Sequence, residues 1–440
     1  MRKLYKKYYI ILLSICILLI SFIIPPLQSP DEMAHMKRSY SLAHGDIVIP
    51  STGNSFINDG VQEFKILYDH FPFKYESKYS RNLIDQAKSI KFSGSSSEES
   101  LVNTAIYFPF IYIPQAIAFK IGELFDLSIY NTYMLARLVN LLACILLLLF
   151  ANRIYSIPFL GLVFLSMPMS LFQLSSINPD AMSFCIAAII GAVTIKLNQL
   201  TIPDKRLFLA LNISLFLLLT VKVNLLPLML ISFYIAYKYK NIRYFYVSLA
   251  TFVLVISWSI FSFKFYVSTD GHFSYGGDSL SKVIFYFNNP NELLLIFYKT
   301  LSNVDFMFNY CKQFIGVLGW LDTQLNMKGY YIILMFIALF IVINFNKNIL
   351  IISLLFSIVF LFTLLILLIT WTNIGQDYIV GVQGRYFIPL CVVLSFIYDK
   401  SKSSYIVNNI SYIQKYMLFI FLMVSCFFTV TALLDRYYIG

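Results

Sequence analysis

Charged residues are scarce in this chain of 440 residues. Only 12% of them are Asp, Glu, Lys or Arg, whereas 59% are hydrophobic, and a soluble domain usually carries about a quarter charged residues. The shortage excludes a soluble fold. Apolar runs on the order of 20 residues, long enough to cross a bilayer, recur from Tyr8 to Leu434. The sequence therefore predicts one polytopic, all-α integral membrane domain over residues 1–440.

Paired cysteines and familiar enzyme motifs are also missing. Five of the six cysteines fall inside apolar runs and Cys311 stands alone in a loop, so neither a disulfide framework nor a CxxC metal pair is expected. The chain has no Walker loop, GxGxxG turn, HExxH or GxSxG sequence, which leaves nucleotide hydrolysis, zinc proteolysis and serine hydrolysis without support. The middles of the apolar runs hold almost no ionisable residues, where a proton-coupled pump or a transporter of charged substrates would place some.

The apolar runs predict about eleven membrane spans. We place them at 8–24, 131–150, 155–173, 181–197, 207–221, 223–237, 244–263, 330–345, 349–370, 386–398 and 416–434. The first run is longer than the apolar part of a signal peptide, so we interpret it as a retained anchor. The run 106–121 is short and contains two prolines, and we expect it to lie on the membrane surface.

The distribution of positive charge fixes the expected orientation. Segments 2–7, 196–206 and 238–243 together carry ten Lys and Arg residues against one acidic residue, Asp204. Because Lys and Arg concentrate in cytoplasmic segments, the N-terminus is predicted to be cytoplasmic and the C-terminus outside. The net charge of +11 thus reflects membrane orientation, and no nucleic-acid partner is expected.

Two large loops then face outward, at 25–130 and 264–329. Within the first, residues 78–103, which include the serine-rich run 93–100, are predicted to be mobile and to act as a flap over a site. In the second, apolar residues at helical spacing from Asn291 to Phe314 predict a helix on the membrane surface.

Unusual polar residues gather on this outward face. Directly after the first span, Asp31 and Glu32 precede His35, and a helix starting here would put Asp31 and His35 on one face. Such a group can supply a general base or hold a divalent cation such as Mg²⁺ or Mn²⁺. The structural alternative is an acidic helix start, since Ser-Pro-Asp-Glu is ordinary N-terminal helix chemistry.

Further candidates head or end the later spans on the same side. Asn178 and Asp180 begin one span, with a helix cap as the alternative. Lys222 stands between two apolar runs, where a lysine is costly unless paired, solvated or functional, with snorkelling to lipid headgroups as the alternative. The remaining candidates are Trp320, Arg137, Asp322, Gln383, Arg385 and Tyr386. The alternative for Trp320 is an interfacial anchor, and the alternative for Arg137 is a salt bridge to an acidic residue of a loop. Arginine presents a donor fork suited to phosphate, and Gly384 would let the backbone approach a ligand.

Taken together, these motifs resemble a bacterial membrane-protein family known as domain of unknown function 2142. The resemblance runs over nearly the whole chain and rests on the order and spacing of the motifs. They are Pro30-Asp31-Glu32 with His35 and Gly45, Tyr107-Phe108-Pro109 with Tyr112 and Pro114-Gln115, Ala136-Arg137-Leu138, Asn178-Pro179-Asp180, Lys222, Gly319-Trp320-Leu321-Asp322 and Gln383-Gly384-Arg385-Tyr386.

That family in turn resembles the C-type glycosyltransferases, which take a sugar from a polyprenyl-phosphate carrier outside the cytoplasmic membrane. The resemblance implies that Asp31 is the general base, with Glu32 and His35 orienting it or the acceptor. Lys222 and Arg385 would neutralise the departing lipid phosphate. Asp180 would bind sugar hydroxyls or a metal ion, and Trp320 would stack on a sugar.

The resulting expectation is an extracytoplasmic glycosyltransferase in a bacterial plasma membrane. Its donor would be a polyprenyl-phosphate-linked sugar and its acceptor a cell-envelope glycan. Two alternatives stay open at this point. A flippase for a lipid-linked sugar would need polar residues along a path through the bilayer, and a polymerase or ligase would transfer a whole glycan.

Overall fold

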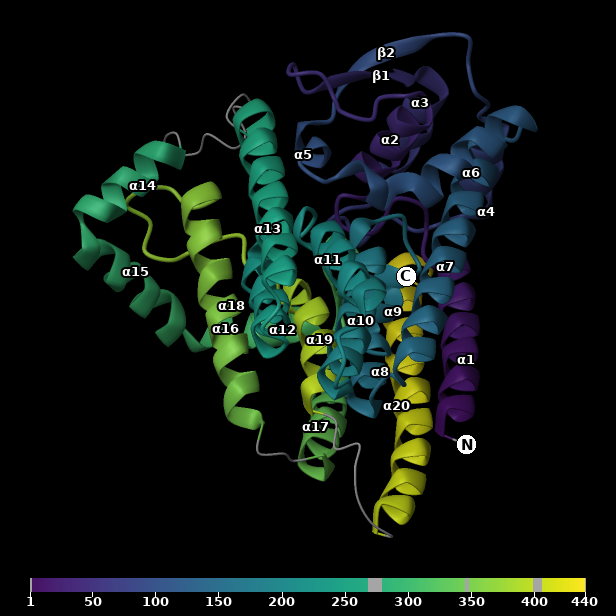
Figure 1. The fold of residues 1–440 in the computed structure, drawn as a ribbon. Helices are drawn as coiled ribbons and strands as arrows, with labels where there is room; N and C mark the ends of the chain where they lie inside the picture. The colour runs from purple at the N-terminus through teal and green to yellow at the C-terminus, as the bar shows by residue number, and fades with distance from the viewer. Residues whose placement is uncertain (1, 268–278, 345–347, 399–405, 440) are drawn as a thin grey trace.

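The computed structural model describes residues 2–267, 279–344, 348–398 and 406–439 and is almost entirely helical. In these residues six helices are long and apolar enough to cross a membrane, which confirms the all-α membrane fold. They are α1 (Arg2–Ile23), α7 (Ile129–Ile154), α10 (Pro179–Gln199), α13 (Ile242–Ser262), α18 (Ile349–Thr370) and α20 (Ile406–Tyr437). Figure 1 shows them as a bundle with the small helices and strands of the first loop above it.

Shorter helices complete the bundle. Within it lie α8 (Phe159–Leu165), α9 (Pro168–Leu174), α11 (Lys205–Leu219), η2 (Val223–Leu228), α12 (Met229–Lys238), η3 (Phe263–Val267), α17 (Met327–Ile343), η4 (Gly384–Phe387) and α19 (Ile388–Tyr398). Three apolar segments of the bundle are 10–17 residues long: η2 with α12, α17, and η4 with α19. They are shorter than the usual transmembrane helix of about 20 residues.

The predicted span 155–173 is not one helix, and this prediction was wrong. The segment forms α8 and α9, each seven residues long. Pro168 is the first residue of α9, where its missing N–H costs nothing. Since proline restricts the residue before it to extended conformations, Met167 with φ −64° and ψ 153° ends the preceding helix. Both short helices are fully buried among the longer ones.

The first and last long helices run side by side in the same direction. Near their starts, the Tyr5 hydroxyl donates to the backbone oxygen of Lys415 at 2.9 Å. Near their ends, the Tyr438 hydroxyl donates to the backbone oxygen of Ile23 at 2.8 Å. The two chain ends therefore lie at opposite ends of the bundle, as the charge distribution predicts (Figure 1).

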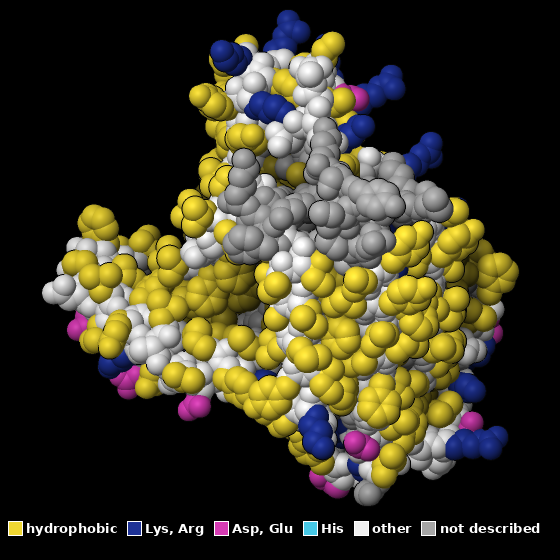
Figure 2. All heavy atoms as spheres, turned by 90° about the horizontal axis from the view of Figure 1, so that it is seen from below, with side chains coloured by type: hydrophobic (Ala, Val, Ile, Leu, Met, Phe, Trp, Pro, Cys, Tyr) yellow, Lys and Arg dark blue, Asp and Glu magenta, His cyan; other side chains and the backbone are white. Residues whose placement is uncertain are grey.

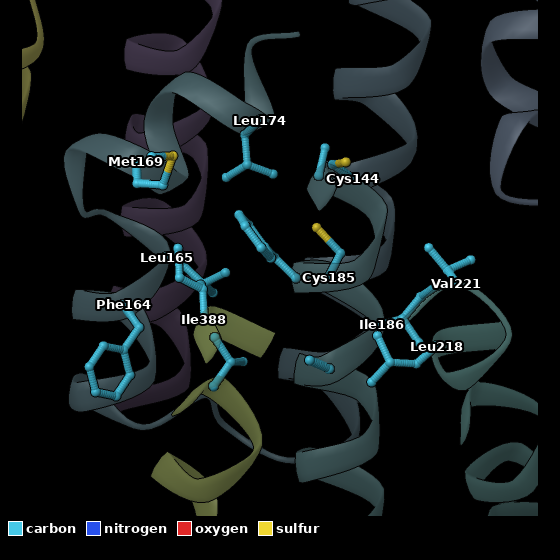
Figure 3. Packing of buried hydrophobic residues seen from close by; sticks show 14 of the residues in the cluster. Cys144, Phe164, Leu165, Met169, Leu174, Cys185, Ile186, Leu218, Val221 and Ile388 are labelled. Atoms are coloured by element: carbon cyan, nitrogen blue, oxygen red, sulfur yellow. The ribbon is translucent and has the colours of Figure 1, made fainter. Parts of the chain in front are cut away.

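Helix α10 is the centre of the bundle. Of its most apolar stretch, 89% is buried by other parts of the chain. Figure 3 shows Cys185 and Ile186 from this helix between Cys144 of α7, Leu218 of α11 and Ile388 of α19. The corresponding stretches of α13 and α18 are only 22% and 17% buried, so these helices expose apolar side chains outward. Figure 2 shows wide hydrophobic areas on the end that carries the N-terminus, broken by few charged side chains.

The first loop folds into a cap of short elements. It contains α2 (Glu32–Ala43), β1 (Asn54–Asn58), α3 (Asp59–Tyr68), α4 (Arg81–Ser89), β2 (Ser96–Ser100), α5 (Val102–Ala105), η1 (Pro109–Tyr112) and α6 (Ile113–Leu124). The segment 78–103, predicted to be a mobile flap, instead contains α4 and β2. Strand β2 pairs with β1 in antiparallel register from Asn54 opposite Ser100 to Asn58 opposite Ser96. The pairing is long-range, and the polar, small side chains of the run gave no strand signal.

The second loop carries three helices, α14 (Ser279–Asn288), α15 (Pro290–Ser302) and α16 (Val304–Gly316), followed by the two-residue strands β3 (Val317–Leu318) and β4 (Thr323–Gln324). The single helix predicted for 291–314 is thus two, with Asn303 between them capping α16. Asparagine is a good helix cap because its side-chain oxygen accepts a free backbone N–H, here that of Phe306.

Candidate functional site

Four charged side chains from distant parts of the sequence meet where the bundle joins the cap. They are Asp31, Asp180, Lys222 and Arg385, which we call the open cluster. Each stands next to the start or end of a helix: Asp31 before α2, Asp180 in the first turn of α10, Lys222 between α11 and η2, and Arg385 in η4. The sequence named all four, and the fold brings them together.

Asp31 is the exposed member of the open cluster. Its backbone has φ 59° and ψ 9°, the left-handed region that side chains other than glycine rarely adopt, and its side chain makes no capping hydrogen bond. The side chain is 53% exposed, and its Oδ2 lies 3.9 Å from Nη2 of Arg385. A strained backbone that holds a carboxylate toward open space is typical of functional sites.

The other three members are buried and paired. The Lys222 ammonium contacts Oδ1 of Asp180, and Nη1 of Arg385 lies 3.2 Å from Oδ2 of Asp180. The Arg385 Nε–H also donates to Oε1 of Gln383 at 2.7 Å. Lys222 Nζ lies 5.1 Å from the centre of the Tyr386 ring, close enough for a cation–π contact. Gln383 and Tyr386 thus lie directly beside the cations, and their predicted role in substrate binding stays a prediction.

His35 and two tyrosines form the wall beside the open cluster. The Nδ1 atom of His35 is 2.8 Å from the Tyr112 hydroxyl, and its ring centre is 5.7 Å from that of Tyr107. Burial lowers the pKa of His35 to about 4; nearby Asp31 and Asp180 raise it, and Lys222 and Arg385 lower it further. Burial also raises the pKa of both tyrosine hydroxyls. At neutral pH His35 is therefore an uncharged hydrogen-bonding group.

A mainly apolar cavity of about 360 Å³ adjoins the cluster. Lys222, Tyr107 and Tyr386 belong to its wall. The rest of the wall comes mostly from η2, α13 and α18 and includes Val223, Asn224, Trp258, Phe263, Thr363, Ile366, Leu367 and Trp371. Since α13 and α18 are the least buried long helices, the cavity is bordered by helices that leave most of their apolar surface exposed.

The sequence did not single out the residues that close this cavity toward the cap. Trp258 donates from Nε1 to the backbone oxygen of Ile106 at 3.0 Å, and Phe108 packs edge-on against Trp258 at 5.0 Å. These contacts fix the segment that carries Tyr107. The only sequence signal was the proline-containing run 106–121, which predicts a surface segment but says nothing of its partner.

Glu32 lies in a different environment, although it is the next residue after Asp31. It is completely buried, and its Oε1 accepts hydrogen bonds from the Tyr133 hydroxyl and the Ile177 N–H, both at 2.7 Å. Its Oε2 accepts from the Ser29 N–H at 3.0 Å. Both oxygens are therefore occupied by the protein itself, as in a residue that holds the chain in place.

Arg137 completes this second group. Its guanidinium donates to the backbone oxygens of Ser21, Ile24 and Pro25 at 2.8 to 3.1 Å and lies 3.6 Å from Oε1 of Glu32. We call Glu32, Tyr133 and Arg137 the sealed cluster. These contacts tie the end of α1 and the start of the first loop to α7. In this arrangement of the described residues Nε is the one nitrogen of Arg137 without a partner, so the guanidinium has little capacity left for the substrate binding predicted from the sequence.

The remaining predicted residues lie apart from the cations. Asn178 caps α10 through the Ala181 N–H and contacts Ser29. Trp320 donates from its indole to the Leu27 backbone oxygen at 3.1 Å. Asp322 pairs with Arg436 at 3.2 Å and accepts from the Phe73 N–H. The last two therefore join the second loop to the first.

The structure explains the glycine at position 384 by helix packing, whereas the sequence predicted that it lets the backbone approach a ligand. A Cβ atom built there would lie 2.0 Å from the Tyr310 backbone oxygen and 2.4 Å from the Phe314 nitrogen. The backbone that approaches this glycine is thus α16 and not a ligand. Any side chain would push η4, and Arg385 with it, away from α16.

No group of three or more His, Cys, Asp or Glu residues is placed to hold a metal ion in the ranges described above. The metal dependence considered from the sequence stays a prediction.

The comparison with protein families confirms the resemblance to domain of unknown function 2142. A family model described as "Predicted membrane protein (DUF2142)" matches residues 13–394. The chain belongs to this family. The match spans every residue of the open and sealed clusters. Searches of curated proteins and of solved structures found no match.

Proposed function

We propose that this DUF2142 protein is an extracytoplasmic glycosyltransferase that moves a sugar from a polyprenyl-phosphate carrier to a cell-envelope glycan. The observation that carries the proposal is the junction of two unlike surfaces. An apolar cavity beside lipid-facing helices meets a pair of buried cations, and an exposed carboxylate lies 3.9 Å from one of them. The cavity and the two cations suit the chain and the phosphate of a lipid phosphate, and the exposed carboxylate suits the general base of a displacement reaction.

The proposed donor lies with its apolar chain in the cavity and its phosphate near Lys222 and Arg385. The cavity is mainly apolar, and two of the helices that line it, α13 and α18, leave most of their apolar surface exposed, which suits a prenyl chain that enters from the bilayer. Cationic hydrogen-bonding groups such as these, held in a site that excludes water, strongly stabilise a negative charge that develops on the phosphate. Tyr107 and Tyr386, at the junction of the cavity and the cluster, would then flank the sugar.

The proposed reaction is a single inverting displacement. Asp31 removes the proton from an acceptor hydroxyl as the hydroxyl oxygen forms a bond to the anomeric carbon. The bond between that carbon and the phosphate oxygen breaks, and the electron pair leaves with the lipid phosphate toward Lys222 and Arg385. General base catalysis of this kind typically contributes about 10²- to 10⁴-fold, so Asp31→Asn should lower activity by that factor.

The proposal requires the open cluster to face outward in a bacterial plasma membrane. Cys311 tests this, because it is the exposed cysteine of α16 in the second loop. A membrane-impermeant maleimide should label it in intact cells, with Cys311→Ser as the control. Labelling only after permeabilisation would place the loop, and the site with it, inside the cell.

The function is tested by the envelope glycans of a deletion strain complemented with wild type or Asp31→Asn at matched membrane levels. Loss of one sugar substituent, restored by wild type alone, supports the transferase. An unchanged glycan, or full restoration by Asp31→Asn, contradicts it. Accumulation of the sugar-lipid on the inner leaflet favours a flippase, and loss of a whole glycan favours a polymerase or ligase.

A further inference from the structure

The two cations assigned to the lipid phosphate already share an anion. Asp180 uses one carboxylate oxygen toward Lys222 and the other toward Arg385. All three residues are at most 8% exposed. Among the described residues Asp180 is the only carboxylate within 4 Å of the Lys222 ammonium, whereas Arg385 has Asp31 as a second, more distant neighbour.

This arrangement makes the buried part of the open cluster carry one net positive charge instead of two. A buried cation with no partner is costly, so Asp180 stabilises Lys222 and Arg385 while no ligand is bound. The same carboxylate repels any phosphate that comes to the two cations, because charges a few ångströms apart in a water-poor site interact strongly.

Resting on the proposed function, we propose that Asp180 is a positioning residue that competes with the lipid phosphate for Lys222 and Arg385. In the empty site it neutralises one of the two buried positive charges, and it thereby weakens the binding of the phosphate by the two cations. Its consequence is easier release of the lipid phosphate product after the sugar has left. This role differs from the sugar or metal contact expected from the sequence.

A purely structural role is the competing explanation. Asp180 lies in the first turn of α10, where a carboxylate is favoured by the helix dipole. A structural carboxylate and a competing one predict opposite effects on anion binding. Loss of a structural residue would loosen the cation pair and weaken binding, whereas loss of a competitor would strengthen it.

The test measures binding of farnesyl phosphate to the full-length protein in nanodiscs of zwitterionic lipid, with empty nanodiscs as the blank. Asp180→Asn should bind at least about tenfold more tightly than wild type, since the variant removes a negative charge next to the binding cations. The matched control is Asp322→Asn, another buried carboxylate paired with an arginine, which should leave the affinity unchanged.

Lys222→Gln keeps the test decisive where Asp180→Asn does not fold, because Asp180 retains Arg385 as a partner. Its affinity for farnesyl phosphate should fall about tenfold. Equal or weaker binding by a folded Asp180→Asn, or unchanged binding by Lys222→Gln, overturns the role of Asp180. Absence of binding to wild type and to folded Asp180→Asn overturns instead the lipid-phosphate donor of the proposed function.

Discussion

Asp31 and Glu32 are adjacent carboxylates with opposite surroundings. The Asp31 side chain is 53% exposed, and its Oδ2 lies 3.9 Å from Nη2 of Arg385. Glu32 is fully buried and accepts three hydrogen bonds. The left-handed backbone at Asp31 turns one side chain out of the bundle while the next enters it. The comparison teaches that an acidic pair in sequence can divide into one residue for chemistry and one for structure.

The strongest way to break this comparison is to remove the two carboxylates one at a time. Glu32→Ala leaves Arg137, the Tyr133 hydroxyl and two backbone N–H groups without their buried acceptor. Removing one partner of a buried ion pair typically costs about 3–5 kcal/mol, so most of the variant should fail to accumulate folded in the membrane. Size-exclusion profiles and thermal melting of the detergent-solubilised protein measure this.

Asp31→Asn is the matched control for that experiment. The Asp31 side chain is exposed and makes no capping hydrogen bond to α2. The free energy of unfolding of Asp31→Asn should therefore stay within about 0.5 kcal/mol of that of wild type. A Glu32→Ala protein as stable as Asp31→Asn would show that the two carboxylates do not divide their roles in this way.

The pH dependence of stability sharpens the comparison at His35. The pKa of this buried side chain is about 4 in the folded protein and about 6.5 when exposed. The unfolded chain therefore binds a proton below pH 6.5 that the folded protein takes up only near pH 4. The free energy of unfolding should fall by up to roughly 3 kcal/mol over this window and be unaffected above it.

Thermal melting between pH 7.5 and pH 4.5 compares wild type with His35→Gln, whose amide retains hydrogen-bonding capacity toward Tyr112. The variant should lose less stability on acidification than wild type. Parallel pH profiles for the two proteins would contradict a dry, neutral His35 beside the open cluster.

The smallest expected effect concerns the backbone that separates the two carboxylates. Because glycine adopts positive φ without a Cβ penalty, Asp31→Gly should stabilise the protein by up to about 1 kcal/mol. The same variant should be inactive in glycan complementation. Asp31→Ala, which keeps the penalty, is the control and should melt below Asp31→Gly; the reverse order would rule out strain at this residue.

The sequence predicted all four residues of the open cluster but not their pairing. Asp31, Asp180, Lys222 and Arg385 were visible as polar residues at the outer ends of apolar runs, where charge is costly without a purpose. Their mutual contacts depend on how α2, α10, α11 and α19 pack. Trp320 and Asp322 had the same signal, yet they join the two loops.

Hydropathy and charge pattern alone determined the all-α membrane class and the placement of the chain ends at opposite ends of the bundle, because the bilayer imposes one apolar length and charge bias on any sequence. Only the tertiary structure decided which charges lie open and which are sealed. The break of 155–173 at Pro168 has a local cause that the sequence contains. The strand in the serine-rich run 93–100 and the pairing of the charges depend instead on partners distant in sequence, and no local pattern of residues specifies them.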